Sequence, residues 1–323
     1  MNQLIIYPEE IDPTNKNIAI ISSTASNGHS KVNLNIDINV ATAAMPLSAE
    51  ERIQHLQQVL KLKPNDHLRI CIINHPSQTQ NSTQQMATVL ELTPHRCVLL
   101  MNFENPNLTV NTVKVNDIQP SLPRIHLFVA LCRPPTMKKI LEHASCMGVD
   151  SFHFFLSHLS EKSYLQSKIL DEKNYRRLIH LGLSQSAHYC QEPKVYFYNS
   201  IKEIKFLSGD NYHHYLLDPD ASDTFNSLNS PNSPNSPNFT PHSCSPSYNI
   251  SLAIGGERGL SSAEKEFFCC NNFQKIKVSA ATLRVEMAIF YALAQLELSF
   301  PLSFTKHRQI LPGIDLKKRT ILN

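Results

Sequence analysis

A cluster of glycines constrains the fold of this chain more than any other feature. Of the 8 glycines in 323 residues, Gly255, Gly256 and Gly259 fall close together. They follow the apolar run Ile250–Ile254, which is typical of a buried strand, and precede Ser261–Glu264, whose Ser-x-x-Glu spacing predicts a helix capping box. Glycine permits positive φ angles and close backbone approach to a ligand. A strand, a glycine turn and a helix therefore predict a ligand-binding corner in an α/β sheet, with a tight turn without ligand as the alternative.

A second segment downstream strengthens the ligand-binding interpretation. Lys275–Val278 is expected to form a short strand, and an apolar helix is expected over Met287–Leu296. Arg284 and Glu286 stand at the entry to that helix, where burial of a lone charge is costly. We therefore expect both side chains to have partners, either in a functional site or in an ordinary ion pair at the start of a helix.

The two segments together resemble a known family. IGGERGLSSAE resembles the IGPEGGFSxxE motif, and VSAATLRVEMA resembles the LGxRILRTETA motif, of the RsmE family of ribosomal RNA methyltransferases. The order and separation of the motifs also match. The resemblance implies a SPOUT-type α/β fold with a C-terminal trefoil knot, a parallel sheet with helices on both faces, and an N-terminal PUA-like β-barrel.

The sequence departs from the family pattern at several places. In the first motif Gly256 replaces Pro and Arg258 replaces Gly, and in the second Ser279 replaces Gly and Ala281 replaces Arg. In two further segments similar to the family, Ser184 and His188 replace Glu and Arg, and His143 and Cys146 replace Lys and Glu. An Arg-to-His change keeps a donor but not a fixed charge at neutral pH. These departures leave weakened RNA binding or lost catalysis open as alternatives.

The N-terminal part is expected to be rich in short strands. Strands are predicted over Leu4–Tyr7, His67–Ile73, Met86–Leu92 and Cys97–Phe103, with a helix over Ile53–Lys61 that begins at a Ser48–Glu51 capping box. RIQHLQQVLKLKPNDHLRI is similar to the HHxxVLRxxxGD stretch in the PUA-like barrel of the family. The resemblance implies RNA binding by His55, Lys61 and Arg69, and by His188 further on. A merely solvated basic face is the alternative.

Downstream of Pro123 the chain alternates strands with helices, which indicates a parallel sheet covered on both sides. Strands are expected over Ile125–Leu131, Val149–Leu156 and Val195–Tyr198, and helices over Thr136–Met147 and Asn174–Cys190. We predict an RNA-binding barrel over residues 1–118 with a low-complexity insertion at about 13–45, and a methyltransferase domain over 119–299. An Asn/Ser/Pro insertion at about 218–247 is expected to be disordered, and 300–323 form a basic tail.

Composition limits the class of protein. The net charge is +3 and the isoelectric point about 8.4, which permits RNA binding without requiring it. No apolar run reaches the length of a membrane span. The 8 cysteines show no CxxC spacing, so no metal site is predicted. We expect a cytoplasmic protein with reduced thiols.

The resemblance implies the function and the site residues. The expected reaction is S-adenosylmethionine-dependent methylation of N3 of a uridine in 16S rRNA of the small ribosomal subunit, by a homodimer. Cofactor contacts are expected at Ile254, Gly255, Gly256, Glu257, Gly259, Val278, Ser279 and Leu283. Arg284 is expected to favour the deprotonated uridine or hold phosphate, and Glu286 to orient Arg284 or act as base. A different RNA target and a catalytically inactive RNA-binding relative are the alternatives.

Overall fold

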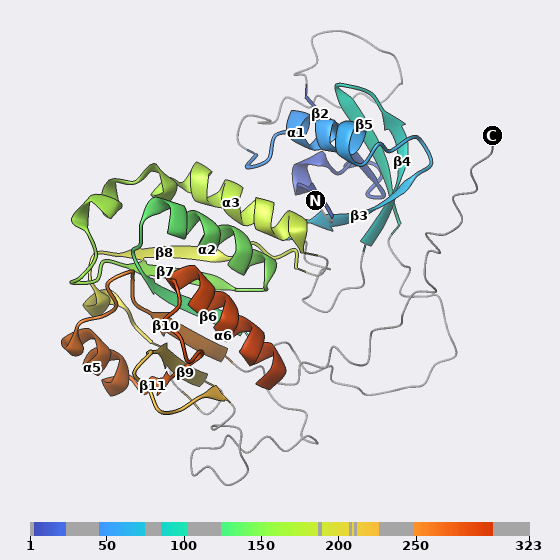
Figure 1. Ribbon diagram of the computed structural model, residues 1–323. Helices are drawn as coiled ribbons and strands as arrows, with labels where there is room; N and C mark the ends of the chain where they lie inside the picture. The colour runs from blue at the N-terminus through green and yellow to red at the C-terminus, as the bar shows by residue number, and fades with distance from the viewer. Residues whose placement is uncertain are drawn as a thin grey trace, which may run out of the picture.

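The computed structural model describes residues 3–23, 45–74, 85–102, 124–186, 189–206, 209, 212–225 and 249–299. Within these ranges the strands form two sheets, an N-terminal one and a larger C-terminal one (Figure 1). The predicted domain boundary at 118/119 falls between the sheets, outside the described residues, as does the predicted tail after residue 300. Among the described helices, none is both long and apolar enough to cross a membrane.

The N-terminal sheet has the strand order β1-β3-β4-β5-β2, in which β1 and β3 are parallel and the other pairs antiparallel. Its strands are β1 (Leu4–Ile6), β2 (Ile18–Ser22), β3 (His67–Ile72), β4 (Gln85–Leu92) and β5 (Arg96–Asn102). Helix α1 (Ala49–Gln54) continues as a π-helical turn over His55–Val59, and a 3-10 turn covers Pro8–Glu10. The predicted capping box is confirmed, since the Ser48 hydroxyl accepts a hydrogen bond from the Glu51 N–H at 3.2 Å.

The C-terminal sheet has the order β11-β9-β10-β6-β7-β8, and every pair within it is parallel. Its strands are β6 (Arg124–Ala130), β7 (Ser151–Phe155), β8 (Lys194–Tyr198), β9 (Tyr212–Leu217), β10 (Asn249–Ile254) and β11 (Gln274–Ile276). The helices are α2 (Pro134–Cys146), α3 (Glu172–Gln185), α5 (Ser262–Cys270) and α6 (Val285–Ser299), with 3-10 turns over Lys162–Gln166, Lys168–Leu170 and Ile201–Glu203.

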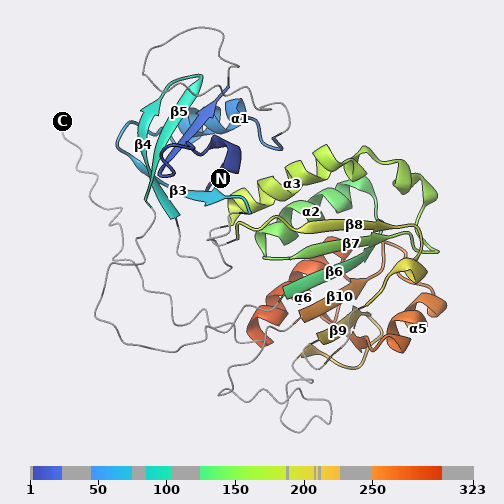
Figure 2. The same ribbon diagram turned by 180° about the vertical axis from the view of Figure 1, so that it is seen from behind.

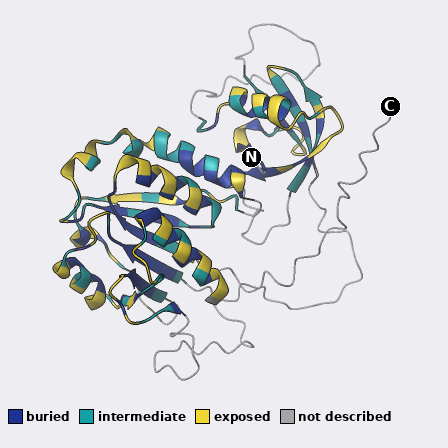
Figure 3. Cartoon of the chain, in the orientation of Figure 1, coloured by how far each residue is buried: buried dark blue, intermediate teal, exposed yellow. Residues whose placement is uncertain are grey.

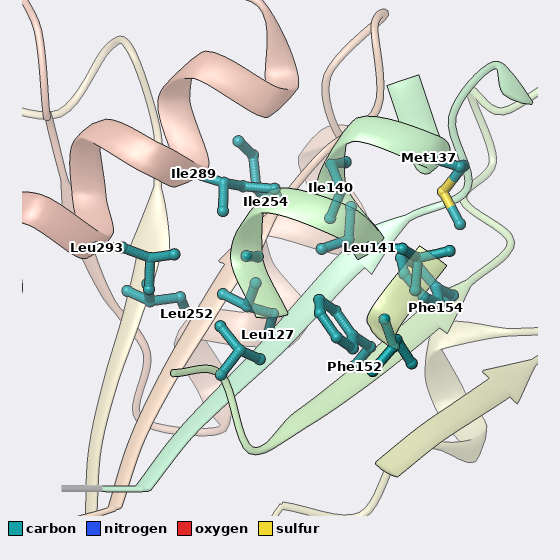
Figure 4. Close-up of a cluster of buried hydrophobic side chains, with 14 of the residues drawn as sticks. Leu127, Met137, Ile140, Leu141, Phe152, Phe154, Leu252, Ile254, Ile289 and Leu293 are labelled. Atoms are coloured by element: carbon teal, nitrogen blue, oxygen red, sulfur yellow. The ribbon is translucent and has the colours of Figure 1, made fainter. Parts of the chain in front are cut away.

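Both faces of this sheet are covered, as predicted. Helices α2, α3 and α6 turn their buried sides toward one face (Figures 1 and 3). Figure 4 shows Ile140 of α2 and Ile289 of α6 above Leu127 and Leu252 of the strands. On the other face, residues of α5 pack in a separate apolar cluster that includes Phe128 and Phe268, and the view from behind shows α5 beside the lower strands (Figure 2). Burial of large apolar side chains on both faces stabilises the parallel sheet.

Three sequence predictions need correction. Strand β2 lies inside the range predicted as a low-complexity insertion, residues 13–45, and residues 24–44 of that range lie outside the described residues. Strand β9 was missed, although it lies between β10 and β11 in the interior of the sheet. Residues 218–225, predicted as the start of the disordered insertion, instead pack with Asp218 and Phe225 buried. The remainder of that insertion, 226–248, lies outside the described residues.

Strand β1 contributes to both cores. Successive side chains of a strand point to opposite sides, so one side of β1 faces the N-terminal core and the other faces the larger unit. Leu4 and Ile6 belong to the N-terminal core, whereas Ile5 packs in the core of the larger unit. Gln3 then meets the end of α3: its backbone N–H donates to the Ser184 carbonyl at 3.1 Å and its amide to the Leu183 carbonyl at 2.9 Å. These bonds satisfy carbonyls that a helix end leaves open, and α3 ends at Gln185 rather than continuing to Cys190 as predicted.

Candidate functional site

A cavity of about 780 Å³ lies where four parallel strands end. The segments that follow β6, β9, β10 and β11 all contribute to its wall, because parallel strands place their carboxyl ends at one edge of a sheet, where ligands of open α/β folds bind. All the residues expected from the two motifs as cofactor or catalytic groups line this cavity: Ile254, Gly255, Gly256, Glu257, Gly259, Val278, Ser279, Leu283, Arg284 and Glu286. The structure therefore brings the two motifs together.

The glycine turn forms one wall, and two of its glycines are required by geometry. A Cβ on Gly255 would lie 2.5 Å from the backbone carbon of Gly259, which is too close for any side chain. Gly259 has a φ of +75°, and a Cβ there would meet nothing within 4 Å. The Gly259 N–H donates to the Gly256 carbonyl at 2.9 Å and closes the turn. The turn thus presents bare backbone to the cavity, which favours close approach of a ligand.

Glu257 ties this turn to the start of α2. Its Oε1 accepts from the Arg133 N–H at 3.0 Å, from the Arg133 Nε–H at 3.3 Å and from the Thr136 hydroxyl at 3.2 Å. Three donors on one carboxylate oxygen hold the turn in register with the loop after β6, and charge-assisted bonds are stronger than neutral ones. Glu257 therefore orients Arg133 and Thr136 at the edge of the cavity.

The helix after the turn starts as predicted. The Glu264 N–H donates to the Ser261 hydroxyl at 3.3 Å, and the Ser261 N–H donates to the Glu264 carboxylate at 2.8 Å. The same carboxylate accepts from the Ser157 hydroxyl at 3.0 Å and from the His158 N–H at 2.8 Å. Burial opposes the charge on Glu264, but the Ser261, His158 and Ser157 hydrogen bonds outweigh it and lower its pKa. The capping box thus also joins α5 to the segment after β7.

The opposite wall is the segment from β11 to α6. The Gln295 amide of α6 donates to the Val278 carbonyl at 2.8 Å, and the Lys277 N–H donates to the Asp223 carbonyl at 2.7 Å, so the start of this segment is held. Arg284 is exposed on the cavity wall. A guanidinium in that position is available to a bound ligand.

Glu286 is buried, with 6% of its side chain exposed, and its ion-pair partner is Lys139 of α2, whose Nζ lies 3.1 Å from Oε1. Burial opposes its charge, but a hydrogen bond from its own backbone N–H and the Lys139 ammonium outweigh burial, and the pKa of Glu286 lies below its usual range. Arg284 contributes a smaller lowering of that pKa. The structure therefore pairs the Glu286 carboxylate with Lys139 of α2, and the orientation of Arg284 by Glu286 stays a prediction.

Several polar wall residues were missed from the sequence. Arg133, Thr136 and Lys139 come from the start of α2, and Asp218 and Lys265 form an ion pair of 2.9 Å at another part of the wall. All follow strand ends or begin a helix that covers the sheet. A polar residue just after a predicted strand is a candidate for a site at the sheet edge, and this rule could have found Arg133 and Thr136 after β6. It could not have found Asp218, because β9, the strand before it, was not predicted.

The residues expected to bind RNA do not line this cavity. Arg69 is an exposed residue of β3, Lys61 is exposed in a left-handed conformation with φ of 52°, and His55 is half-buried at the end of α1. All three lie in the N-terminal unit. His188 lies outside the described residues.

Comparison with known proteins places the C-terminal unit in a family. The family described as RNA methyltransferase domain matches residues 119–297. The chain is 23% identical over 245 residues to ribosomal RNA small subunit methyltransferase E 1 of Borreliella burgdorferi. This alignment covers 75% of this chain and 88% of that protein. It is 26% identical over 174 residues to ribosomal RNA small subunit methyltransferase E of Treponema pallidum, covering 53% of this chain and 60% of that one.

The fold also matches a solved structure over most of its length. The ribosomal RNA small subunit methyltransferase E of Neisseria gonorrhoeae, crystallised with S-adenosylmethionine, aligns with a TM-score of 0.57 at 14% identity. The alignment covers 92% of this chain and 97% of that one. This likeness confirms the fold class predicted from the two motifs, an α/β unit preceded by a PUA-like sheet.

Proposed function

This chain belongs to the family of RNA methyltransferase domains and is a divergent member of its RsmE branch, and on that premise we propose that it methylates N3 of a uridine in small-subunit ribosomal RNA, with S-adenosylmethionine as donor. One observation carries the proposal. The two motifs, separated in sequence, line one cavity at the carboxyl edge of the sheet. The two relatives named above are small-subunit rRNA methyltransferases, which supports the choice of substrate. We propose that the reaction takes place in the cytoplasm, on the ribosomal RNA that is its substrate.

The cavity fits the cofactor. Its volume of about 780 Å³ lies within the range of ligand pockets, roughly 300–1,000 Å³. Apolar side chains such as Ile254 and Leu283 line the cavity together with the bare backbone of Gly255 and Gly259. When bound, S-adenosylmethionine supplies a methyl group already activated by its sulfonium, so positioning by these wall residues is the main contribution of the protein.

Arg284 is the proposed catalytic residue. Uridine N3 carries a weakly acidic proton, and a fixed cation nearby favours the deprotonated, nucleophilic form. Arg284 is exposed on the cavity wall, where its guanidinium can face a bound nucleotide. Glu286 is proposed as a positioning residue: through Lys139 it connects the start of α6, which follows Arg284, to α2. The lowered pKa of Glu286 and its ion pair with Lys139 make this carboxylate a weak base, which disfavours the role of general base.

The N-terminal unit is proposed to bind the RNA outside the cavity. Lys61 and Arg69 are exposed basic residues of this unit, and His55 stands near the first of them in sequence. Phosphate contacts from such residues position RNA without reading its sequence. The proposal that His188 contributes rests on the resemblance alone.

A homodimer is supported by the last helix. α6 buries Ile289, Leu293 and Leu296 against the rest of the unit, yet it also exposes an apolar stripe. This α6 stripe consists of Met287, Tyr291, Ala294 and Leu298, which recur at helical spacing, and 47%, 51% and 84% of Met287, Tyr291 and Leu298 are exposed. A helix that is apolar all round is normally buried all round. We therefore propose that a second copy of this chain covers the stripe.

The function is tested by methylation of RNA in vitro. Purified protein is incubated with methyl-labelled S-adenosylmethionine and small ribosomal subunits that lack the modification, and the labelled nucleoside is identified by mass spectrometry. We expect N3-methyluridine, and we expect Arg284→Ala to lower kcat by roughly a hundredfold while cofactor binding by calorimetry is retained. Another methylated nucleoside establishes a different target. Cofactor binding without any methylated RNA establishes an inactive relative.

A further inference from the structure

A second, smaller cavity lies on the other side of the glycine turn. Its volume is about 310 Å³, and Arg133, Gly256, Glu257, Arg258 and Gly259 line both cavities. The remaining wall comes from the end of β6 and from the segment after β7: Leu131, Leu159, Ser160, Glu161 and Tyr164. This second cavity is near the lower limit of ligand pockets, so it suits one nucleotide base better than a whole nucleoside cofactor. The two cavities share the glycine turn as part of their walls.

Two exposed arginines flank the second cavity, and most of their guanidinium N–H donors can bind a ligand. Arg133 has 65% of its side chain exposed and Arg258 has 68%. Among the described residues, each guanidinium makes one hydrogen bond, from Arg133 Nε to Glu257 at 3.3 Å and from an Arg258 Nη to Glu161 at 3.3 Å. A guanidinium carries five N–H donors. Exposed ion pairs contribute little, so both side chains are available for bidentate binding of phosphate, which is the geometry that arginine favours.

The rest of the second cavity suits a base. Tyr164 is half-buried, with its ring packed partly against the main core, and Leu159 adds an apolar wall. Aromatic rings that face a site beside arginines are typical of proteins that hold unstacked RNA bases. The Ser160 hydroxyl donates to the Leu131 carbonyl at 2.9 Å, which holds the segment against β6.

We propose that this second cavity receives a nucleotide that flanks the target uridine in a single-stranded RNA segment, with Arg133 and Arg258 on its phosphates and Tyr164 against its base. This inference rests on the proposed function for the identity of the substrate as RNA. Arg258 stands where the family motif has glycine, so the arginine is a contact that this chain has and the motif lacks. On this interpretation the departure from the motif strengthens RNA binding.

The test measures RNA affinity and cofactor affinity separately. A short single-stranded oligoribonucleotide containing uridine is titrated by fluorescence anisotropy, and S-adenosylmethionine by calorimetry. Arg258→Gly, Arg133→Gln and Tyr164→Leu are each expected to weaken RNA binding on the order of tenfold. Tyr164 does not line the donor cavity, so Tyr164→Leu is expected to leave cofactor affinity unchanged. For each arginine variant, the slope of log Kd against log salt concentration is also expected to fall by about 0.7. The matched control is Arg124→Gln, an exposed arginine at the opposite end of β6.

Glu161→Gln is expected to change RNA affinity in the opposite direction. Loss of this carboxylate frees Arg258 from its partner, so RNA affinity is expected to rise a few-fold, whereas a purely structural Arg258–Glu161 pair predicts no gain in RNA affinity. RNA affinities equal to that of Arg124→Gln in all three cavity variants overturn the inference, even if the wild type methylates rRNA. Conversely, weakened RNA binding in these variants together with no methylated product from the wild type overturns the proposed function and leaves the nucleotide site standing.

Discussion

Lys139 of α2 and Glu286 of α6 form an ion pair of 3.1 Å across one wall of the larger cavity. The carboxylate is buried, whereas 50% of the lysine side chain is exposed. Since α2 and α6 cover the same face of the sheet, this pair connects the two helices whose first turns border the cavity. The position of Arg284, two residues before Glu286, depends on where α6 begins.

Removal of Lys139 is expected to destabilise the protein. Lys139→Met leaves the buried Glu286 carboxylate without its cation, and we expect a loss of about 1–2 kcal/mol, less than for a fully buried pair because the lysine is half exposed. Because the folded-state pKa of Glu286 is lowered, its stabilising effect is present above the unfolded pKa and is lost as pH falls through the folded one. Urea denaturation at several pH values measures this, with Lys138→Met, its exposed neighbour, as control. Equal stability of the two variants at neutral pH contradicts the prediction.

Gly259→Ala tests the glycine turn. Its φ of +75° costs a residue with a Cβ about 1–2 kcal/mol, and the added methyl projects into open space at the cavity. We expect both a lower melting temperature and weaker binding of S-adenosylmethionine by calorimetry. Gly259→Asn, which tolerates a left-handed backbone better, should recover part of the stability but not the affinity. If Gly259→Ala binds S-adenosylmethionine as tightly as the wild type does, the ligand does not approach the backbone closely at this residue.

Tyr291→Glu tests the proposed dimer. A charge in the middle of the α6 stripe cannot be buried without a partner, so we expect the wild type to sediment as a dimer and the variant as a monomer in analytical ultracentrifugation. Glu297→Gln, a charge change at another exposed position of the same helix, is the control and should remain dimeric. A monomeric wild type at micromolar concentration, or a dimeric Tyr291→Glu, excludes this interface.

Glu192 gives a pH-dependent contribution to stability near the contact between the two sheets. It accepts hydrogen bonds from Arg176 Nε at 2.6 Å and Nη at 2.9 Å, and His180 Nε2 lies 3.2 Å away. Burial opposes its charge, but His180 and Arg176 outweigh burial and lower the pKa of Glu192 to about 2. The stabilisation is therefore complete above the unfolded pKa of about 4.3 and is lost as pH falls toward 2, up to about 3 kcal/mol.

Glu192→Gln should remove that acid-dependent loss, as measured by denaturation from pH 5 to pH 2. The control is Glu172→Gln, since Glu172 is an exposed partner of the same Arg176 at 3.8 Å. If Glu172→Gln flattens the pH profile as much as Glu192→Gln does, the stabilisation does not come from the buried pair.

Local chemistry made much of the candidate site predictable. The glycine turn, the Ser261–Glu264 capping box and the apolar runs of β6 and β10 depend on residues within a few positions of each other, and the structure confirms them. Asn65 is a similar case: it stands where the family pattern has glycine and adopts φ of 75°, a conformation that asparagine tolerates better than most residues. The shared cavity followed from the resemblance of the two motifs to one family.

By itself, the sequence determined the α/β class, the turn that faces the cavity and the residues of both motifs, because strand periodicity, capping and glycine conformation are short-range effects. The tertiary structure alone decided that Glu286 pairs with Lys139, that Gln3 ends α3, and that β9 lies inside the sheet. Each of these depends on groups far apart in the chain, 180 residues in the case of Gln3 and Leu183. Their contact is set by how whole elements pack, which no local pattern records.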